Sequence, residues 1–269
     1  MLKQRVVTAV IGLLLVIFTT WFGDPWFSIL IACAALVGTF EFYRMVSNSG
    51  KGCPLTYFGL LWALALVLSP HYNNAEVLPI VMTLAIVLSL VWLLYRSPQE
   101  EAFHNWAWTI AGVLYVGWML SYWLNLRIFE DGRNWVYLAL LTTFANDTGA
   151  FFVGKAWGRH RLASAISPGK TWEGVVGGLL SAMAGAVIVF VVLNLFSSFA
   201  SRYWQVILLA CLIAIFAQLG DLVESLLKRN MGVKDSGKLL PGHGGVLDRF
   251  DSLIFVGPIV YYYVTCLAG

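Results

Sequence analysis

Long apolar segments recur along this chain and leave little polar sequence between them. Apolar residues make up 59% of the 269 positions, and charged residues make up 12%. A water-soluble fold needs more polar sequence than this to cover its surface, so lipid must be the solvent for most of the chain. The sequence therefore predicts an all-α fold, a polytopic bundle of membrane-spanning helices.

A helix needs about 20 mostly apolar residues to cross a hydrocarbon layer of about 30 Å. Nine segments bounded by charges, Pro or Asn/Gly clusters meet or approach this length, and the third is the shortest. They are Arg5 to Phe22, Trp26 to Val46, Pro54 to Pro70, Glu76 to Tyr95, Phe103 to Leu126, Asn134 to Gly154, Trp172 to Phe196, Tyr203 to Arg229 and Phe250 to Ala268.

The predicted segments divide the chain into two regions. Residues 1–133 hold about five spans, and residues 134–269 hold about four. The second region also contains two long polar connections, Lys155 to Thr171 and the stretch after Leu222 up to Arg249. Long loops in an otherwise tight bundle are where function usually lies, so we expect residues 134–269 to be the catalytic region.

The first apolar segment follows Lys3 and Arg5, as the apolar part of a secretory signal peptide would. It ends in Thr19-Thr20-Trp21-Phe22-Gly23-Asp24, which is not a small-residue cleavage site, so we expect a retained span. The four cysteines are single, and their spacing predicts neither a disulfide framework nor a zinc site.

The basic residues predict the orientation of the chain. With nine spans, fourteen of the seventeen Lys and Arg residues fall on the side of the N terminus. Cytoplasmic loops collect such residues, so the N terminus is expected in the cytoplasm and the C terminus outside. The net charge of +3 is too small for a protein that binds nucleic acid through its overall charge.

Several carboxylates lie within or beside the predicted spans, where an ionisable group costs a few kcal/mol or more unless it faces a polar cavity. Asp147 and Asp221 both lie toward the cytoplasmic ends of their spans. Along the eighth span, a polar face is formed by Asp221, Glu224, Ser225 and Lys228. The alternative is a cytoplasmic helix end that becomes solvated. Asp248 and Asp251 open the ninth span, where simple helix capping is the alternative for Asp251.

Carboxylates beside Lys and Arg are typical of a site that binds Mg²⁺ and phosphate groups. Pro241-Gly242-His243-Gly244-Gly245 adds backbone that can approach a phosphate closely, and His243 is either a general base or a phosphate-binding donor. Ser167 to Thr171 ends like a P-loop, but Ser164 stands where the first glycine is needed and no strand precedes the segment.

Three further side-chain contacts are predicted from spacing alone. Lys170 and Glu173, one helical turn apart, form an ordinary surface pair in one interpretation and bind phosphate in the other. Glu41 and Arg44 are expected to pair with each other. Small residues every fourth position in the seventh span predict close helix packing, and they are Gly174, Gly178, Ala182 and Ala186.

The segment from Ser225 to Asp251, SLLKRNMGVKDSGKLLPGHGGVLDRFD, resembles the signature of the phosphatidate cytidylyltransferases, also called CDP-diglyceride synthetases. Two further segments of this chain, Asn146 to Gly149 and Ser167 to Gly174, resemble the other characteristic stretch of this family. The fixed positions of the signature are filled by Ser225, Lys228, Arg229, Lys234, Asp235, Gly237, Pro241, His243, Gly244, Gly245, Asp248, Arg249 and Asp251.

The resemblance implies that CTP and phosphatidate react to give CDP-diacylglycerol and pyrophosphate in phospholipid biosynthesis. It implies Mg²⁺ held by Asp221 and Asp248, alone or with a second, monovalent cation. It also implies a homodimer in the bacterial inner membrane, with the site facing the cytoplasm. Acyl-chain preference and the use of dCTP beside CTP stay open.

The residues expected to carry the reaction combine this resemblance with the charge pattern. The catalytic residues are Asp221, Asp248, Lys228, Arg229 and His243. The substrate-binding residues are Asp147, Lys170, Glu173, Ser225, Lys234, Gly244, Gly245, Arg249 and Asp251.

Two other classes of function fit parts of the pattern. An ion-coupled transporter also places carboxylates inside a bundle of spans, but here they gather near the cytoplasmic boundary and no inverted repeat is visible. A lipid head-group transferase that consumes CDP-diacylglycerol would carry an Asp-Gly-Ala-Arg arrangement, which this sequence lacks. A purely structural membrane scaffold would leave the charges unexplained.

Overall fold

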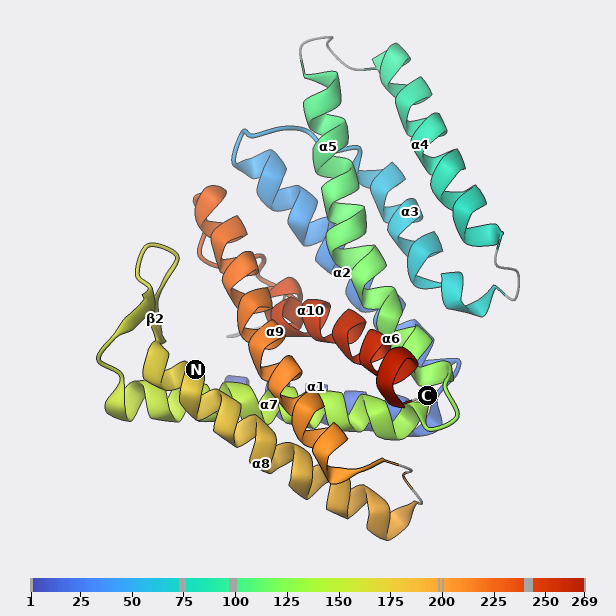
Figure 1. Cartoon of the computed structure of the whole chain (residues 1–269). Coiled ribbons are helices and arrows are strands. Elements are labelled where there is room, and N and C mark those ends of the chain that lie inside the picture. The colour runs from blue at the N-terminus through green and yellow to red at the C-terminus, as the bar shows by residue number, and fades with distance from the viewer. Residues whose placement is uncertain are drawn as a thin grey trace. The chain divides into compact units, whose positions relative to one another are not determined.

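A computed structural model describes residues 2–72, 76–96, 101–197, 199, 201–239 and 244–268. This part of the chain is nearly all helical (Figure 1). Its α-helices are α1 (Leu2–Phe22), α2 (Trp26–Asn48), α3 (Thr56–Val67), α4 (Val77–Arg96), α5 (Ala102–Gly112), α6 (Met119–Ile128), α7 (Gly132–Trp157), α8 (Trp172–Phe196), α9 (Tyr203–Asn230) and α10 (Leu247–Tyr263).

Short elements complete the fold. A 3₁₀ turn, η1 (Ser69–His71), follows α3, and the π-helical segments η2 (Val113–Trp118) and η3 (Val264–Ala268) continue α5 and α10. The strands β1 (Arg161–Ala163) and β2 (Ser167–Thr171) form an antiparallel hairpin.

Each of the nine predicted apolar segments is helical, which confirms a polytopic helix bundle. Seven helices in the described residues are long and apolar enough to cross a membrane. They are Trp26–Asn48, Val77–Tyr95, Ala102–Ile128, Gly132–Trp157, Trp172–Phe196, Tyr203–Asn230 and Leu247–Leu267. Val10–Phe22 and Thr56–Val67 are shorter, and at 1.5 Å per residue the 12 residues of α3 measure about 18 Å.

The chain forms two compact units. Unit 1 comprises Met1–Asn125 and Asn230–Arg249, and unit 2 comprises Leu126–Arg229 and Phe250–Gly269. The loop that follows α9 therefore folds with the N-terminal helices. These packing units do not follow the predicted division at residue 133. That division assigned catalysis to residues 134–269, and the assignment stays a prediction.

Tyr43 of α2 holds unit 1 together at its centre. Its side chain is fully buried, and its hydroxyl donates a hydrogen bond of 2.6 Å to the carbonyl oxygen of Thr109 in α5. A Cβ atom at Gly59 would lie 2.2 Å from this hydroxyl, and one at Gly112 would lie 2.4 Å from the ring. Glycine at these two positions lets α3 and α5 close around the tyrosine.

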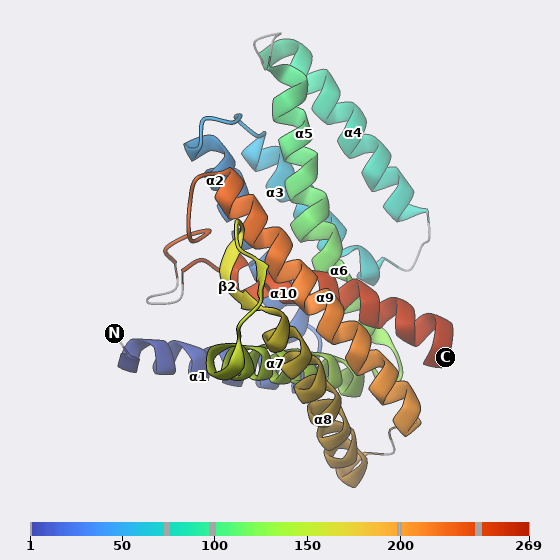
Figure 2. The ribbon, with the colours of Figure 1, turned by 60° about the vertical axis from the view of Figure 1, so that its left-hand side comes forward.

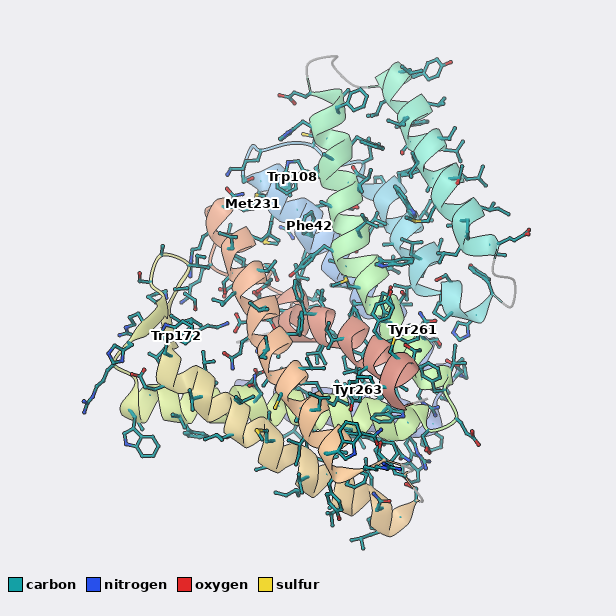
Figure 3. All side chains as sticks on the ribbon, in the orientation of Figure 1. Phe42, Trp108, Trp172, Met231, Tyr261 and Tyr263 are labelled. Atoms are coloured by element: carbon teal, nitrogen blue, oxygen red, sulfur yellow. The ribbon has the colours of Figure 1, made fainter. Side chains whose placement is uncertain are left out.

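Aromatic and aliphatic side chains fill the rest of unit 1. Trp62, Leu66, Ala85 and Val113 form a buried apolar cluster that joins α3, α4 and η2. Phe42 of α2 and Trp108 of α5 lie beside each other with ring centroids 6.1 Å apart (Figure 3). Contacts of this kind position α2, which carries the buried carboxylate of Glu41.

Helices α7 and α8 run side by side in unit 2 (Figures 1 and 2), and the predicted stripe of small residues lies between them. Ala182 and Ala186 are buried. A Cβ atom at Gly178 would lie 2.7 Å from Oδ1 of Asn146, and one at Gly177 would lie 2.4 Å from Cβ of Val153. The prediction of close helix packing is therefore confirmed.

The connection between α7 and α8 differs from the sequence-based expectation. Ser167–Thr171 is itself a strand, and Arg161–Ala163 pairs with it, so the view that no strand precedes this segment was wrong. Helix α8 begins directly after β2, where the Thr171 hydroxyl accepts a hydrogen bond from the amide of Gly174. This cap fixes where the hairpin ends and the helix begins.

We expect Gly177→Ala to destabilise the protein by about 1–3 kcal/mol, because the added methyl group has no room against Val153. Thermal unfolding in detergent micelles measures the effect. Gly12→Ala is the matched control, since a Cβ atom at Gly12 meets nothing within 4 Å. Equal melting temperatures for both variants and the wild type would contradict the packing described for α7 and α8.

Candidate functional site

An ion pair between Lys170 and Asp221 lies at the centre of the polar residues in unit 2. Nζ of Lys170, at the end of β2, lies 2.8 Å from Oδ2 of Asp221 in α9. The same ammonium group donates to the carbonyl oxygen of Gln218 at 3.3 Å. Ser225, one turn further along α9, donates to Oδ1 of Asp221 at 3.2 Å. Both oxygens of this carboxylate therefore have donors, one from Lys170 and one from Ser225.

Amide side chains extend this network to α7. Nε2 of Gln218 donates to Oδ1 of Asn146 at 3.2 Å, and Nδ2 of Asn146 donates to Oδ1 of Asp147 at 3.1 Å. Asn146 is fully buried. The chain of contacts brings the predicted residues Asp147, Lys170 and Asp221 into one polar cluster, with Gln218 as its connecting residue.

The predicted polar face of α9 is confirmed, because its residues four positions apart contact each other. Lys228 and Glu224 form an ion pair with an N–O distance of 2.5 Å, four residues apart. Glu224 is fully buried, so the alternative of a solvated helix end is wrong for this residue. Arg229 follows and donates through Nε to the carbonyl oxygen of Ile166 in the turn of the hairpin, at 3.2 Å.

Glu173 does not pair with Lys170. Oε1 of Glu173 lies 2.6 Å from Nδ1 of His160, and the backbone amide of His160 also donates to this carboxylate. The interpretation of Lys170 and Glu173 as a surface pair was therefore wrong, because the hairpin carries Lys170 to α9 instead. His160, which the sequence analysis did not single out, holds Glu173 at the start of α8.

Asp251 lies in α10, at a point where that helix packs closely on α9. A Cβ atom at Gly220 would lie 2.6 Å from the backbone oxygen of Asp251. Oδ1 of Asp251 accepts a hydrogen bond of 2.7 Å from the amide of Ser252. Since α10 begins at Leu247, Asp251 lies one turn inside the helix, and its proposed role as a cap at the helix start does not hold.

Asp248 belongs to unit 1, where it organises the end of the loop that follows α9. Its Oδ2 accepts from the amide of Gly245 at 2.8 Å and from the amide and hydroxyl of Ser236, each at 2.9 Å. Two backbone amides, with the Ser236 hydroxyl within hydrogen-bond distance of the same oxygen, hold the carboxylate in a defined direction. Gly245 is buried, and Gly244 has φ +85°, a conformation that favours glycine.

Glu41 of α2 lies in the same part of unit 1. It accepts hydrogen bonds from Ser236, Val246 and Leu247, and among the described residues no ion pair joins it to Arg44. The expected pair of Glu41 and Arg44 was therefore wrong. The pair was suggested by a spacing of three residues within one helix. Such local spacing cannot indicate hydrogen-bond donors that lie about 200 residues further along the chain.

Three predicted site residues remain to be placed: Lys234, Arg249 and His243. Lys234 and Arg249 are exposed in unit 1. His243 lies outside the described residues, as does Pro241.

The carboxylates fit Mg²⁺ in their chemistry. Within the described residues, no three His, Cys, Asp or Glu side chains are grouped so that they could hold a metal ion by themselves. Mg²⁺ is usually bound by one or two carboxylates, with water and phosphate oxygens completing its shell. Asp221 and Asp248 are both held in place by hydrogen-bond donors, and carboxylate oxygens are ligands that this ion prefers.

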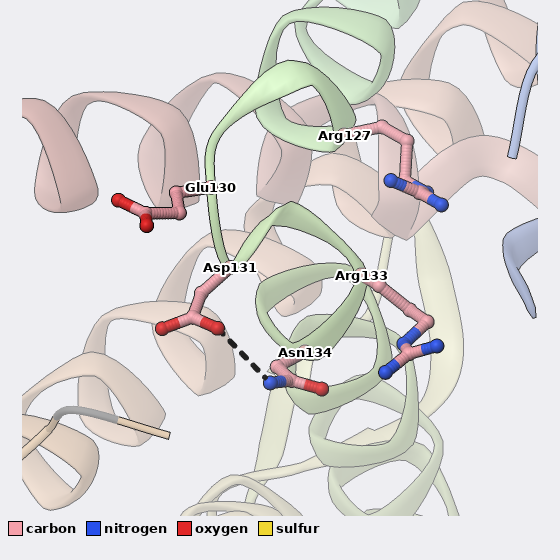
Figure 4. A pocket seen from close by; sticks show the side chains of 5 residues that line it. All are labelled: Arg127, Glu130, Asp131, Arg133 and Asn134. Atoms are coloured by element: carbon pink, nitrogen blue, oxygen red, sulfur yellow. Dashed lines mark hydrogen bonds between the residues drawn. The ribbon is translucent and has the colours of Figure 1, made fainter. Parts of the chain in front are cut away.

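A small pocket of about 160 Å³ lies elsewhere, where α6 meets α7 (Figure 4). Its lining residues are Arg127, Glu130, Asp131, Arg133 and Asn134. Asn134 donates to Oδ1 of Asp131 at 3.3 Å, which ties the start of α7 to the preceding turn. None of the predicted site residues lines this pocket.

The chain is similar to known proteins along almost its whole length. Residues 3–267 match the Cytidylyltransferase family. A phosphatidate cytidylyltransferase of Staphylococcus haemolyticus is 36% identical over 261 residues, covering 96% of this chain and 97% of the relative. Proteins of the same name from Bacillus subtilis and from a Synechocystis species are each 35% identical, covering 97% and 98% of this chain and 97% of each relative.

Helices that are long and apolar enough to cross a membrane, together with these relatives, indicate an integral membrane enzyme. This chain belongs to the cytidylyltransferase family.

A double-mutant cycle tests the partner of Lys170. We expect Lys170→Met and Asp221→Asn to couple by about 1 kcal/mol in the free energy of unfolding, because each removes one partner of the same ion pair. Lys170→Met and Glu173→Gln should be additive within about 0.5 kcal/mol, since Glu173 contacts His160. Coupling to Glu173 and additivity with Asp221 would contradict the assignment.

Proposed function

We propose that this chain transfers the cytidylyl group of CTP to phosphatidate, giving CDP-diacylglycerol and pyrophosphate. The observation that carries this proposal is its similarity, over 96–98% of its length, to proteins named phosphatidate cytidylyltransferase. The polar contacts of unit 2 support it, because they hold two lysines, Lys170 of β2 and Lys228 of α9, against carboxylates of the largely apolar helix α9.

In the proposed reaction, an oxygen of the phosphatidate phosphate forms a bond to the α-phosphorus of CTP. The bond from that phosphorus to the oxygen bridging to the β-phosphate breaks, and its electron pair leaves with pyrophosphate. A phosphate monoester is already anionic near neutral pH, so little base catalysis is needed. Positioning and charge neutralisation would then supply most of the rate.

We assign the charge-neutralising role to Lys170, Lys228, Arg229 and Arg249. Two of these cations are held by carboxylates, Lys170 by Asp221 and Lys228 by Glu224, so their ammonium groups are positioned before substrate binds. The Gly244-Gly245 backbone, with His243, would bind the pyrophosphate portion. Asp147, Glu173, Ser225, Lys234 and Asp251 complete the proposed substrate-binding set.

We propose Asp221 and Asp248 as the carboxylates that hold Mg²⁺. When bound, Mg²⁺ supplies charge neutralisation of the phosphate oxygens. The hydrogen bonds from Ser225 to Asp221 and from Ser236 to Asp248 would orient the two ligands. A second, monovalent cation belongs to the same proposal.

The proposal places the enzyme in a bacterial inner membrane with nine spans. In it the N terminus and the site face the cytoplasm, where CTP is present, and the C terminus lies outside. The excess of Lys and Arg on one side supports this orientation. A homodimer and the acceptance of dCTP are expected from the family resemblance alone.

Substitution of the proposed metal ligands tests the reaction. We expect Asp221→Asn and Asp248→Asn each to lower Mg²⁺-dependent pyrophosphate release from CTP and phosphatidate about 100-fold or more, because each removes an anionic oxygen ligand. The assay uses purified protein in detergent, and EDTA should abolish the wild-type rate. Near wild-type rates in both variants would sink the metal assignment.

Glu130→Gln is the control for this experiment. It neutralises an exposed carboxylate of unit 2, the unit that contains Asp221, in the turn before α7. Its rate should equal that of the wild type. A wild-type protein that releases no pyrophosphate would favour a transporter, which needs two membrane-separated compartments to act.

Cysteine labelling tests the orientation. In a variant without the four native cysteines, we introduce Glu130→Cys before α7 or Ser164→Cys in the hairpin, since both positions are exposed. A membrane-impermeant maleimide should label Glu130→Cys in intact cells. Labelling of Ser164→Cys should appear only after the membrane is opened. The opposite pattern would show that the proposed orientation is inverted.

A further inference from the structure

Glu41 is a buried carboxylate in the second half of α2, and only 5% of its surface is exposed. Its donors all come from the two ends of the loop after α9. Oε1 accepts from the amide of Val246 at 3.1 Å. Oε2 accepts from the amide of Leu247 at 2.9 Å and from the hydroxyl of Ser236 at 3.1 Å. All of these residues belong to unit 1.

Two of these donors lie at the N terminus of α10, which begins at Leu247. The first amides of a helix have no acceptor within the helix, and an anion near them is favourable. A helix of this kind is usually capped by a residue next to it in sequence. Here the carboxylate comes from a different helix of unit 1, so Glu41 of α2 caps the first turn of α10.

Glu41 and Asp248 share a donor. The hydroxyl of Ser236 lies within hydrogen-bond distance of Oε2 of Glu41 and of Oδ2 of Asp248, at 3.1 and 2.9 Å. A hydroxyl group has one hydrogen and can donate to one of the two oxygens at a time. The orientation of the Asp248 carboxylate therefore depends on the position of Ser236, which Glu41 also binds.

The glycines of the loop are explained by the same carboxylate. A Cβ atom at Gly237 would lie 2.3 Å from Oε1 of Glu41, and one at Gly245 would lie 2.4 Å from Oε2. Side chains at these positions would displace Glu41 from its donors. The loop backbone thus packs against both carboxylate oxygens of Glu41, at Gly237 and at Gly245.

We infer that Glu41 is a positioning residue for the proposed reaction: by binding Ser236, Val246 and Leu247, it fixes the direction in which Asp248 presents its carboxylate. This inference rests on the proposed metal-binding role of Asp248. Glu41 itself acts through these contacts and is assigned no contact with substrate.

The test uses Glu41→Gln in the full-length protein. The substitution keeps the shape of the side chain but replaces one carboxylate oxygen by an NH₂ group, which then faces an N–H or O–H donor. We expect the Mg²⁺ concentration for half-maximal pyrophosphate release to rise about tenfold, since residues that orient a metal ligand typically contribute 10- to 100-fold to affinity or activity. We also expect faster hydrogen exchange at the amides of Val246 and Leu247.

Two further variants separate positioning from general destabilisation. Ser236→Ala removes the shared donor and leaves Glu41 with its two amides, so it should shift the Mg²⁺ requirement in the same direction by a smaller factor. Thr39→Val is the matched control in α2, because Thr39 is buried and its hydroxyl has no hydrogen-bond partner in the described part of the chain. Its Mg²⁺ requirement and exchange rates should equal those of the wild type.

The possible outcomes are distinct. Wild-type exchange at Val246 and Leu247 in Glu41→Gln overturns the inference. Faster exchange with an unchanged Mg²⁺ requirement also overturns it, because Glu41 would then support the fold alone. A wild-type protein without pyrophosphate release would contradict the proposed function. The effect of Glu41→Gln on Mg²⁺ binding would then be measured as the Mg²⁺ concentration that raises the melting temperature, compared with that of the wild type.

Discussion

A carboxylate in an apolar helix must be supplied with hydrogen-bond donors by the protein, because lipid offers none. This requirement organises both units. In unit 2, Asp221 draws Lys170 from the hairpin onto α9. In unit 1, Glu41 draws both ends of the loop after α9 onto α2. The polar contacts of the candidate site are thus also the ones that give these carboxylates hydrogen-bond donors.

Features governed by local spacing were predictable from the sequence. Apolar runs of about 20 residues predicted the helices, and small residues at every fourth position predicted the packing of α7 on α8. The contacts of Asp221 with Ser225 and of Glu224 with Lys228 follow from four-residue spacing in α9. In α9 the two partners of each contact lie on the same face of the helix. In α8 the small residues at every fourth position mark the face that packs on α7.

Partners that are distant in sequence were not predictable in this way. Lys170 was matched with the nearby Glu173, and Glu41 with the nearby Arg44, whereas their contacts lie on α9 and in the loop before α10. His160 and Gln218 carried no motif, although both hold predicted site residues in place. Helix length was also not predictable from the apolar runs, because the segment Pro54 to Pro70 contains an α-helix of only 12 residues, Thr56–Val67.

The contacts of Glu41 have a consequence for the order in which the protein assembles. Its three donors follow it by 195, 205 and 206 residues along the chain. Chains are synthesised from the N terminus, at about 5–20 residues per second. Helix α2 therefore leaves the ribosome well before Ser236, Val246 and Leu247 exist. Its carboxylate therefore has none of these three donors until the chain is almost complete, so the loop beside Asp248 is among the last parts of unit 1 to take its final shape.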